Sequence, residues 1–180
     1  RKASDNEYLH KDFHGALSLA IDYLDRNYGE QAVRSYLRQF AVSYYSEITK
    51  QLSERGLVAL AEHFAGVYGI EGGSASIRLS ESGDELSIEV EQCPAVAHMR
   101  ERGFVIARLF VETTRTVNAA LCEGTPFEYE LLEYDAETGR STHRHPCSAR
   151  RERQREAEPR MRRPREALRI RVAEKDREHR

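Results

Sequence analysis

The 180-residue sequence contains no tryptophan, only three cysteines, and no apolar run near the roughly 18 residues that a membrane-spanning helix needs. The cysteines, Cys93, Cys122 and Cys147, are odd in number and lack the spacing of a disulfide framework. The first residues, 1–4, lack the apolar segment of a signal peptide. We therefore expect a protein of the reducing cytoplasm with no membrane partner.

Several motifs of nucleotide and hydrolase chemistry are also missing. The sequence contains no glycine-rich phosphate loop, no nucleophile elbow, no paired CxxC motifs and no dinucleotide-binding fingerprint. Nucleotide chemistry therefore has no support in the sequence.

Charge is distributed unevenly along the chain. Residues 150–180 contain 13 basic and 7 acidic side chains, a local charge of +6, so residues 1–149 carry −8 of the total of −2. Because phosphate contacts need clustered Lys and Arg, the acidic body argues against nucleic acid as a partner. The Arg/Glu-rich tail, 148–180, has few large apolar residues, which favours a solvated or disordered segment over a polyanion-binding arm.

Helical periodicity precedes strand periodicity along the chain. Ser4 and Glu7 have capping-box spacing before a first helix that Gly29 ends, and a second helix from about 30 to 52 is expected to pair with it as an antiparallel hairpin. A third helix follows Gly56. The remaining expected elements are a β-hairpin around the turn 81–84, a short helix at 94–102, a helix at about 109–122, and a hairpin with strands at 127–134 and 140–145.

This order predicts one α+β domain, residues 4–147. Four strands grouped in two hairpins form a mainly antiparallel sheet with helices on one face. The strand-to-helix junction at Cys93-Pro94 is the hinge of this arrangement.

Cys93 is the first candidate for chemistry, because it occupies the N-cap position of a helix that begins with Pro94. The positive end of a helix dipole favours the thiolate, so Cys93 could be a catalytic nucleophile or a metal ligand. The alternative is a thiol that packs under the edge of the sheet. His98, five residues later, is more than one helical turn away and is a weak partner for the sulfur.

Two further sets of polar residues could line a ligand site. His10 and His14 are spaced i, i+4 on the first helix, so both rings can border a pocket or bind one divalent metal. Glu112, Arg115, Asn118 and Cys122 recur along the helix at 109–122, either as a solvated face or as a polar wall in which Arg115 holds a carboxylate. The segment 142–147 contains two histidines and a cysteine, and an accidental cluster is the favoured interpretation.

The stretches EVEQCPAVAHMRERG and TRTVNAALCEGTPFEYELLEYDAETGRS resemble the bacterial L-2-amino-thiazoline-4-carboxylic acid hydrolase family, which is similar to the 4-vinyl-reductase-type small-molecule-binding domains. The likeness covers residues 88–141. It implies a ligand pocket between helices and sheet, with Cys93 at the family's strand-end cysteine and residues 112–122 on its pocket helix. The sequence departs from the expected cysteines or acidic residues at 110–114.

Together these observations predict a domain that binds a small, carboxylate-bearing molecule and could hydrolyse a C–N or C–S bond of a cyclic amidine or thiazoline through Cys93. The metal candidates are His10, His14 and Cys93, and the cofactor is unknown. The alternative is a non-catalytic ligand sensor or dimerisation module, in which Tyr36, Tyr44 and Tyr45 could form the interface of a homodimer.

Overall fold

The computed structural model describes residues 11–148, so Ser4, Glu7, His10 and the tail from residue 149 lie outside the described residues. In chain order the helices and strands are α1 (Asp12–Tyr28), α2 (Glu30–Tyr44), α3 (Ser46–Arg55), α4 (Leu57–Glu71), β1 (Ser74–Leu79), β2 (Glu85–Gln92), α5 (Pro94–Glu101), α6 (Glu112–Cys122), β3 (Glu130–Tyr134) and β4 (Ser141–Pro146).

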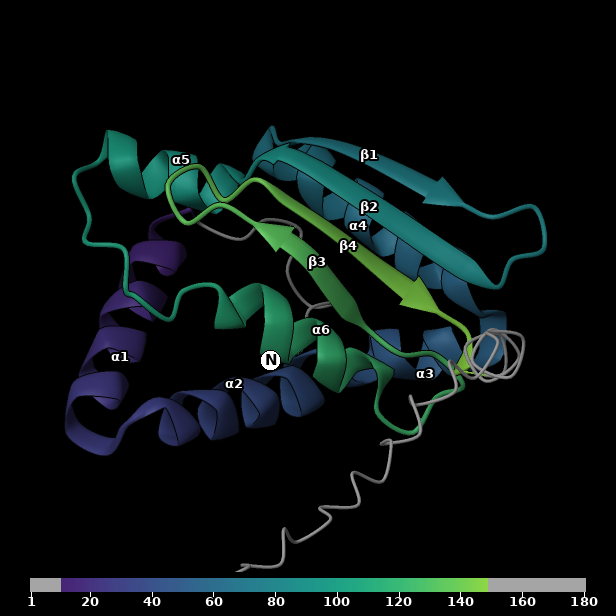
Figure 1. Ribbon diagram of the computed structural model, residues 1–180, viewed down its shortest axis with the longest axis horizontal. Coiled ribbons are helices and arrows are strands. Elements are labelled where there is room, and N and C mark those ends of the chain that lie inside the picture. Colours follow the sequence, from purple (N-terminus) through teal and green to yellow (C-terminus); the bar gives the residue numbers. More distant parts are fainter. Residues whose placement is uncertain (1–10, 149–180) are drawn as a thin grey trace, which may run out of the picture.

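The four strands form one antiparallel sheet in the order β1-β2-β4-β3, in which β2 pairs with β4 and so joins the two hairpins. Figure 1 shows the helices gathered on one side of this sheet, with α4 directly behind it and α2 and α6 below. The predicted α+β fold, with a mainly antiparallel sheet and helices on one face, is thus confirmed.

Strand alternation determines which side chains face the helices. On β2 the inward residues are Leu86, Ile88 and Val90, all buried, and on β4 they are Ser141, His143 and His145. The opposite face is polar, and there Arg78 of β1 bonds to Glu89 of β2. This two-sided pattern is expected for an antiparallel sheet that is covered on one face.

The predicted helix at 30–52 is two helices, because the chain breaks at Tyr45, where φ is −99° and ψ is 16°. Tyr45 packs against both of the hydrophobic clusters that make up the core. The bend after α2 lets Leu37 and Ala41 face one cluster while Leu52 of α3 faces the other. A straight helix could not present one stripe to both.

The core is divided between these two clusters. One joins α1, α2, α5 and α6 and contains Ile21, Val33 and Met99 among its fully buried members. The other joins α3, α4 and the inner face of the sheet and contains Leu52, Leu60 and Ile88. Partly buried side chains bridge the clusters, and the space left between them is the candidate site.

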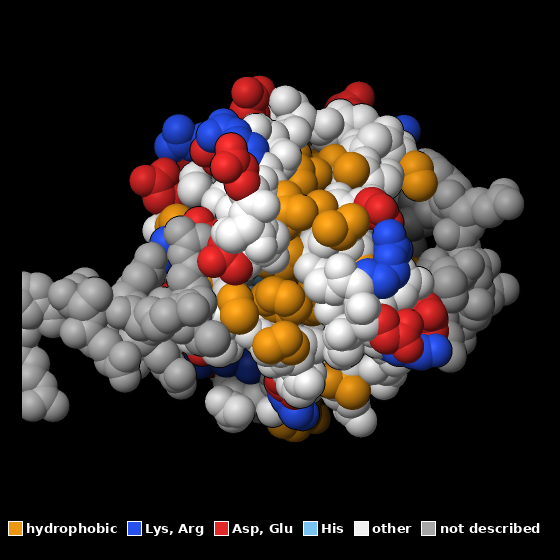
Figure 2. Space-filling model, turned by 90° about the vertical axis from the view of Figure 1, so that its right-hand side faces the viewer, with side chains coloured by type: hydrophobic (Ala, Val, Ile, Leu, Met, Phe, Trp, Pro, Cys, Tyr) orange, Lys and Arg blue, Asp and Glu red, His pale blue; other side chains and the backbone are white. Residues whose placement is uncertain are grey.

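The molecular surface is mixed in character. Figure 2 shows hydrophobic side chains in a band across the middle of one face, with acidic and basic side chains on both sides of it. Within residues 11–148, no helix is long and apolar enough to cross a membrane.

The turn between β3 and β4 packs closely against the end of β2. Gly139 is buried with φ of +68°, and an added Cβ would overlap the Cβ of Cys93 and lie 2.9 Å from Cγ2 of Val96. The Cys93 amide also donates a hydrogen bond to the Thr138 carbonyl, at 3.2 Å. The position of Cys93 therefore depends on this turn.

We predict that Gly139→Ala lowers the free energy of unfolding by about 2 kcal/mol more than Gly83→Ala does, because overpacking adds to backbone strain. Gly83 is the matched control, since its φ is +69° and nothing lies within 4 Å of its added Cβ. Urea denaturation of both variants measures the difference. Equal losses would show that the turn at residues 135–139 does not pack tightly against Cys93.

Candidate functional site

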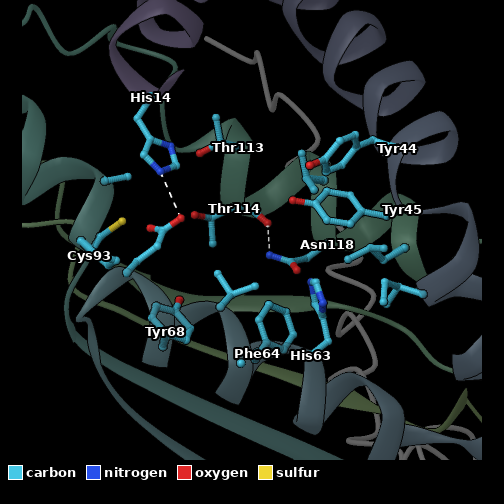
Figure 3. A pocket seen from close by; sticks show the side chains of 18 of the residues that line it. His14, Tyr44, Tyr45, His63, Phe64, Tyr68, Cys93, Thr113, Thr114 and Asn118 are labelled. Atoms are coloured by element: carbon cyan, nitrogen blue, oxygen red, sulfur yellow. Dashed lines mark hydrogen bonds and ion pairs between the residues drawn. The ribbon is translucent and has the colours of Figure 1, made fainter. Parts of the chain in front are cut away.

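A cavity of about 860 Å³ lies between the two core clusters (Figure 3). Its walls come from all six helices and from β4, and they include members of both clusters, such as Leu37 and Phe64. Ligand-binding cavities in proteins typically have volumes of about 300–1,000 Å³ and mainly apolar walls with a few polar groups. The size and the lining of this cavity therefore suit a small organic molecule.

Aromatic side chains form a continuous arc around the cavity. Successive ring centroids lie 5.0 to 6.5 Å apart, through stacked, edge-to-face and tilted contacts. In order, the rings belong to Phe13, Phe40, Tyr44, Tyr45, His63, Phe64 and Tyr68. Figure 3 shows Tyr44 and Tyr45 at one end of the cavity, and His63, Phe64 and Tyr68 along the wall that α4 supplies.

A polar group of side chains lies at the other end of the cavity. His14 of α1 approaches Glu71 at the end of α4, with Nε2 3.3 Å from Oε1. Glu71 is 8% exposed, and both residues line the cavity together with Cys93. In Figure 3 the sulfur of Cys93 lies on the same side of the cavity as this pair. Residues from three separate parts of the chain are thus brought together.

Cys93 is at the N-cap of α5, as predicted, with φ of −73° and ψ of 120° and with Pro94 in the first helical turn. The expected bias toward thiolate is nevertheless wrong. Burial raises the pKa of the Cys93 thiol and outweighs the backbone N–H groups of Val96 and Ala95, which lower it, while the charge of Glu71 raises it further. Desolvation therefore dominates over the helix terminus, and Cys93 is a neutral thiol at neutral pH.

His14 is the member of the predicted His10/His14 pair that can be placed, since His10 lies outside the described residues. His98 is not among the described residues that line the cavity. Its Nε2 lies 2.8 Å from Oδ1 of Asp12 and ties α5 to α1. This position agrees with the separation of His98 from Cys93 that the helical spacing predicts.

The polar face predicted on α6 does not form a single wall of the cavity. Glu112 is 1% exposed, and it accepts hydrogen bonds from Arg115 Nη1 at 2.8 Å and from Thr116 Oγ1 at 2.6 Å. Arg34 of α2 also reaches Oε1 of Glu112, at 3.4 Å. Glu112 therefore links α2 to α6, and Arg115 pairs with it instead of pointing to a ligand.

Asn118 is the one residue of the predicted face that lines the cavity, in the part of the chain that the structure describes. Its Nδ2 donates to the Thr114 carbonyl at 2.7 Å. Cys122 is buried, with Sγ 3.5 Å from Nδ1 of His145. An α-helix turns by about 100° per residue, so side chains six residues apart point in directions that differ by about 120°. Glu112 and Asn118 therefore face different surroundings.

The tyrosines proposed for a dimer surface are also divided. Tyr36 is exposed, but Tyr44 and Tyr45 are half-buried and line the cavity. They do not form one exposed aromatic surface.

Metal binding was predicted through His10, His14 and Cys93. Among residues 11–148, no group of three or more His, Cys, Asp or Glu side chains is arranged to hold a metal ion. Because His10 lies outside the described residues, the predicted set stays a prediction.

The two histidines of β4 belong to the segment 142–147 that the sequence suggested to be an accidental cluster, and the structure instead places both on the inner face of the sheet. His143 lines the cavity opposite Ile88, and His145 lies opposite Leu86, both almost fully buried. Their Nδ1 atoms approach Tyr129 Oη and Cys122 Sγ, whereas neither Nε2 has a hydrogen-bond partner among the described residues. The alternation from Ser141 to His145 would have predicted this shared inward face.

Glu71 and Tyr68, which lie at the end of α4 and line the cavity together with Cys93, were also missed at the level of sequence. No local motif marks them. Their role depends on the approach of α1 and α5, which brings His14 and Cys93 to the same place.

Comparison with protein-family models gives no match for this chain, and a search of curated proteins gives none either. The resemblance to the thiazoline hydrolases therefore stays a prediction.

We predict that stability falls as the pH drops below 6.5. Burial lowers the pKa of His143 to about 4 and that of His145 to about 3, so the unfolded chain binds more protons than the folded one between these values and 6.5. From pH 7.5 to pH 5 each histidine should remove about 2 kcal/mol of folding free energy.

Urea denaturation at both pH values measures this loss. In the double variant His143→Leu/His145→Leu the loss should shrink by about 4 kcal/mol, because the titrating groups are gone. An unchanged pH dependence in that variant would contradict the assignment.

Proposed function

We propose that the chain is a small-molecule-binding domain whose ligand occupies the cavity between the helices and the sheet. The observation that supports this proposal is the cavity itself, which has a volume of about 860 Å³, a continuous aromatic lining and one polar end. Protein interiors are close-packed, and voids larger than a water molecule are few. The hollow opens to the surface beside the exposed Gly66 and Ile70, and an open cleft of this size with mainly apolar walls is typical of a ligand site.

The ligand enters a site with several hydrogen-bonding groups already positioned. The phenols of Tyr45 and Tyr68 line the cavity, and no hydrogen bond joins either hydroxyl to another described residue. Burial raises the pKa of Tyr45 to about 12 and also raises that of Tyr68, so both remain protonated donors. Such groups would fix the orientation of a mainly apolar ligand.

Binding in the cavity predicts a specific effect of Gly66→Trp. Gly66 lies on α4 in the cavity wall, and nothing lies within 4 Å of an added Cβ. The indole would occupy part of the cavity, so saturable binding of the neutral fluorescent probe N-phenyl-1-naphthylamine should weaken at least about tenfold, because apolar burial of the probe is lost.

The matched control is Gly69→Trp. Gly69 is also an exposed glycine of α4 with nothing within 4 Å of its added Cβ, and it does not contribute to the described cavity wall. Both variants replace a helical glycine, so both gain helix propensity equally. Absence of saturable binding to the natural sequence, or equal binding by the two variants, would contradict the proposed function.

A second candidate is hydrolysis of a C–N or C–S bond of a cyclic amidine or thiazoline, with Cys93 as nucleophile. It is favoured by the position of Cys93 at the polar end of the cavity, beside His14 and Glu71. Attack would require the thiol to lose its proton, for which His14 and Glu71 are the acceptors at hand. No Arg or Lys occurs among the described lining residues, so the cavity provides no cation for a substrate carboxylate.

The hydrolase candidate is tested with 2-amino-2-thiazoline, which lacks a carboxylate, and with L-2-amino-thiazoline-4-carboxylate. If either is hydrolysed, Cys93→Ala should lower kcat at least about 1,000-fold, as expected for loss of a nucleophile. The rate should rise with pH to beyond about 8.5, the ordinary pKa of a thiol.

Cys147→Ala is the control, because Cys147 is outside the described cavity wall. Normal turnover by Cys93→Ala would remove Cys93 from the mechanism.

The state of the three cysteines is relevant to the cellular compartment of the protein. Cys93, Cys122 and Cys147 are all free, which suits a reducing compartment such as the cytoplasm.

A further inference from the structure

The charges around the cavity are of one sign. Glu47, Glu62 and Glu71 line it, whereas neither Lys nor Arg is present among the described lining residues. Glu62 is already held by Arg55, whose Nη2 lies 2.9 and 2.8 Å from its two carboxylate oxygens. The remaining negative charge belongs to Glu47 and Glu71.

Glu71 is the more deeply placed of these two carboxylates. Its side chain is 9% exposed, and its contact with His14, at 3.3 Å, is the one polar side-chain contact that it makes within residues 11–148. No hydrogen bond joins its Oε2 to another described residue. A buried carboxylate without a strong cationic partner is costly, and a positive group that enters the cavity would offset that cost.

The surroundings of Glu71 respond to its negative charge. After burial, which is the larger cause, the charge of Glu71 contributes to the raised pKa of Cys93, Tyr45 and Tyr68. All three side chains line the cavity. The charge of Glu71 thus acts on the part of the cavity that these three side chains line, and a negative charge there attracts a cation and repels an anion.

The aromatic arc favours the same sign of charge. The face of a phenyl or phenol ring carries negative quadrupole density and attracts ammonium groups, by roughly 0.5–2 kcal/mol for each ring. Tyr68 lies between Cys93 and Phe64 in Figure 3 and brings a ring close to the acidic end. The carboxylate of Glu71 and the aromatic arc together provide the two kinds of group that attract an ammonium ion.

We propose that the ligand is an organic cation, with an apolar or aromatic body against the ring arc and an ammonium group paired with Glu71. This inference rests on the proposed function, because it names the chemical class of the molecule in the same cavity. It replaces the carboxylate-bearing ligand that sequence analysis predicted with Arg115 as its anchor.

Three indoles that share a two-carbon chain at position 3 test the sign of the charge. Tryptamine carries an ammonium, 3-ethylindole is neutral, and indole-3-propionate carries a carboxylate. Each is titrated against the full 180-residue chain loaded with N-phenyl-1-naphthylamine, and displacement gives its affinity. Tryptamine should bind at least about tenfold more tightly than 3-ethylindole, and indole-3-propionate should bind most weakly.

Glu71→Gln should abolish the preference for tryptamine over 3-ethylindole while 3-ethylindole still binds. The control, Glu81→Gln, removes the same charge at the exposed β1–β2 turn and should leave the preference intact. A thermal melt of each variant verifies folding. If Glu71→Gln fails to fold, the comparison of the three indoles on the natural sequence decides the outcome.

The possible failures are distinguishable. Equal or tighter binding of 3-ethylindole or indole-3-propionate would overturn the cationic ligand and leave the binding function in place. Failure of all three indoles to displace a probe that does bind would also overturn it. Absence of saturable probe binding would overturn the proposed function itself.

Discussion

The antiparallel pairing of β2 with β4 is the constraint on which the rest of the structure depends. It joins two local hairpins into one sheet and places Ile88 opposite His143 on the face that the helices cover. It also brings the β3–β4 turn to the end of β2, where the Thr138 carbonyl accepts a hydrogen bond from the Cys93 amide. The sheet, the start of α5 and one wall of the cavity are thus held in a single register.

The helical layer meets this sheet without filling the space between them. One cluster holds the helices together, and the other holds α3 and α4 on the sheet, while Tyr45 contacts both. Large rings line the gap instead of closing it. A concave cleft with mainly apolar, aromatic walls and a few polar groups is the usual form of a small-molecule site, and this cleft is therefore the feature that supports a bound ligand.

Electrostatics at the polar end are set by burial more than by helix geometry. A helix N-terminus favours a thiolate, yet burial raises the pKa of Cys93, and the nearby negative charge of Glu71 adds to the effect. The same negative charge is the feature that would select a positive ligand. A site that disfavours an anionic sulfur suits the proposed cationic ligand better than it suits a nucleophilic thiolate.

Local periodicity was sufficient to predict the α+β class, the two hairpins and the cysteine at the N-cap of α5, since these depend on neighbouring residues alone. Strand alternation also held the information that His143 and His145 face inward, although sequence analysis favoured an accidental cluster. The break at Tyr45, the pairing of Arg115 with Glu112 and the meeting of His14, Glu71 and Cys93 were decided by tertiary structure. Each depends on contacts between segments far apart in the chain, and burial, which decides the protonation of Cys93, exists only once those segments have packed.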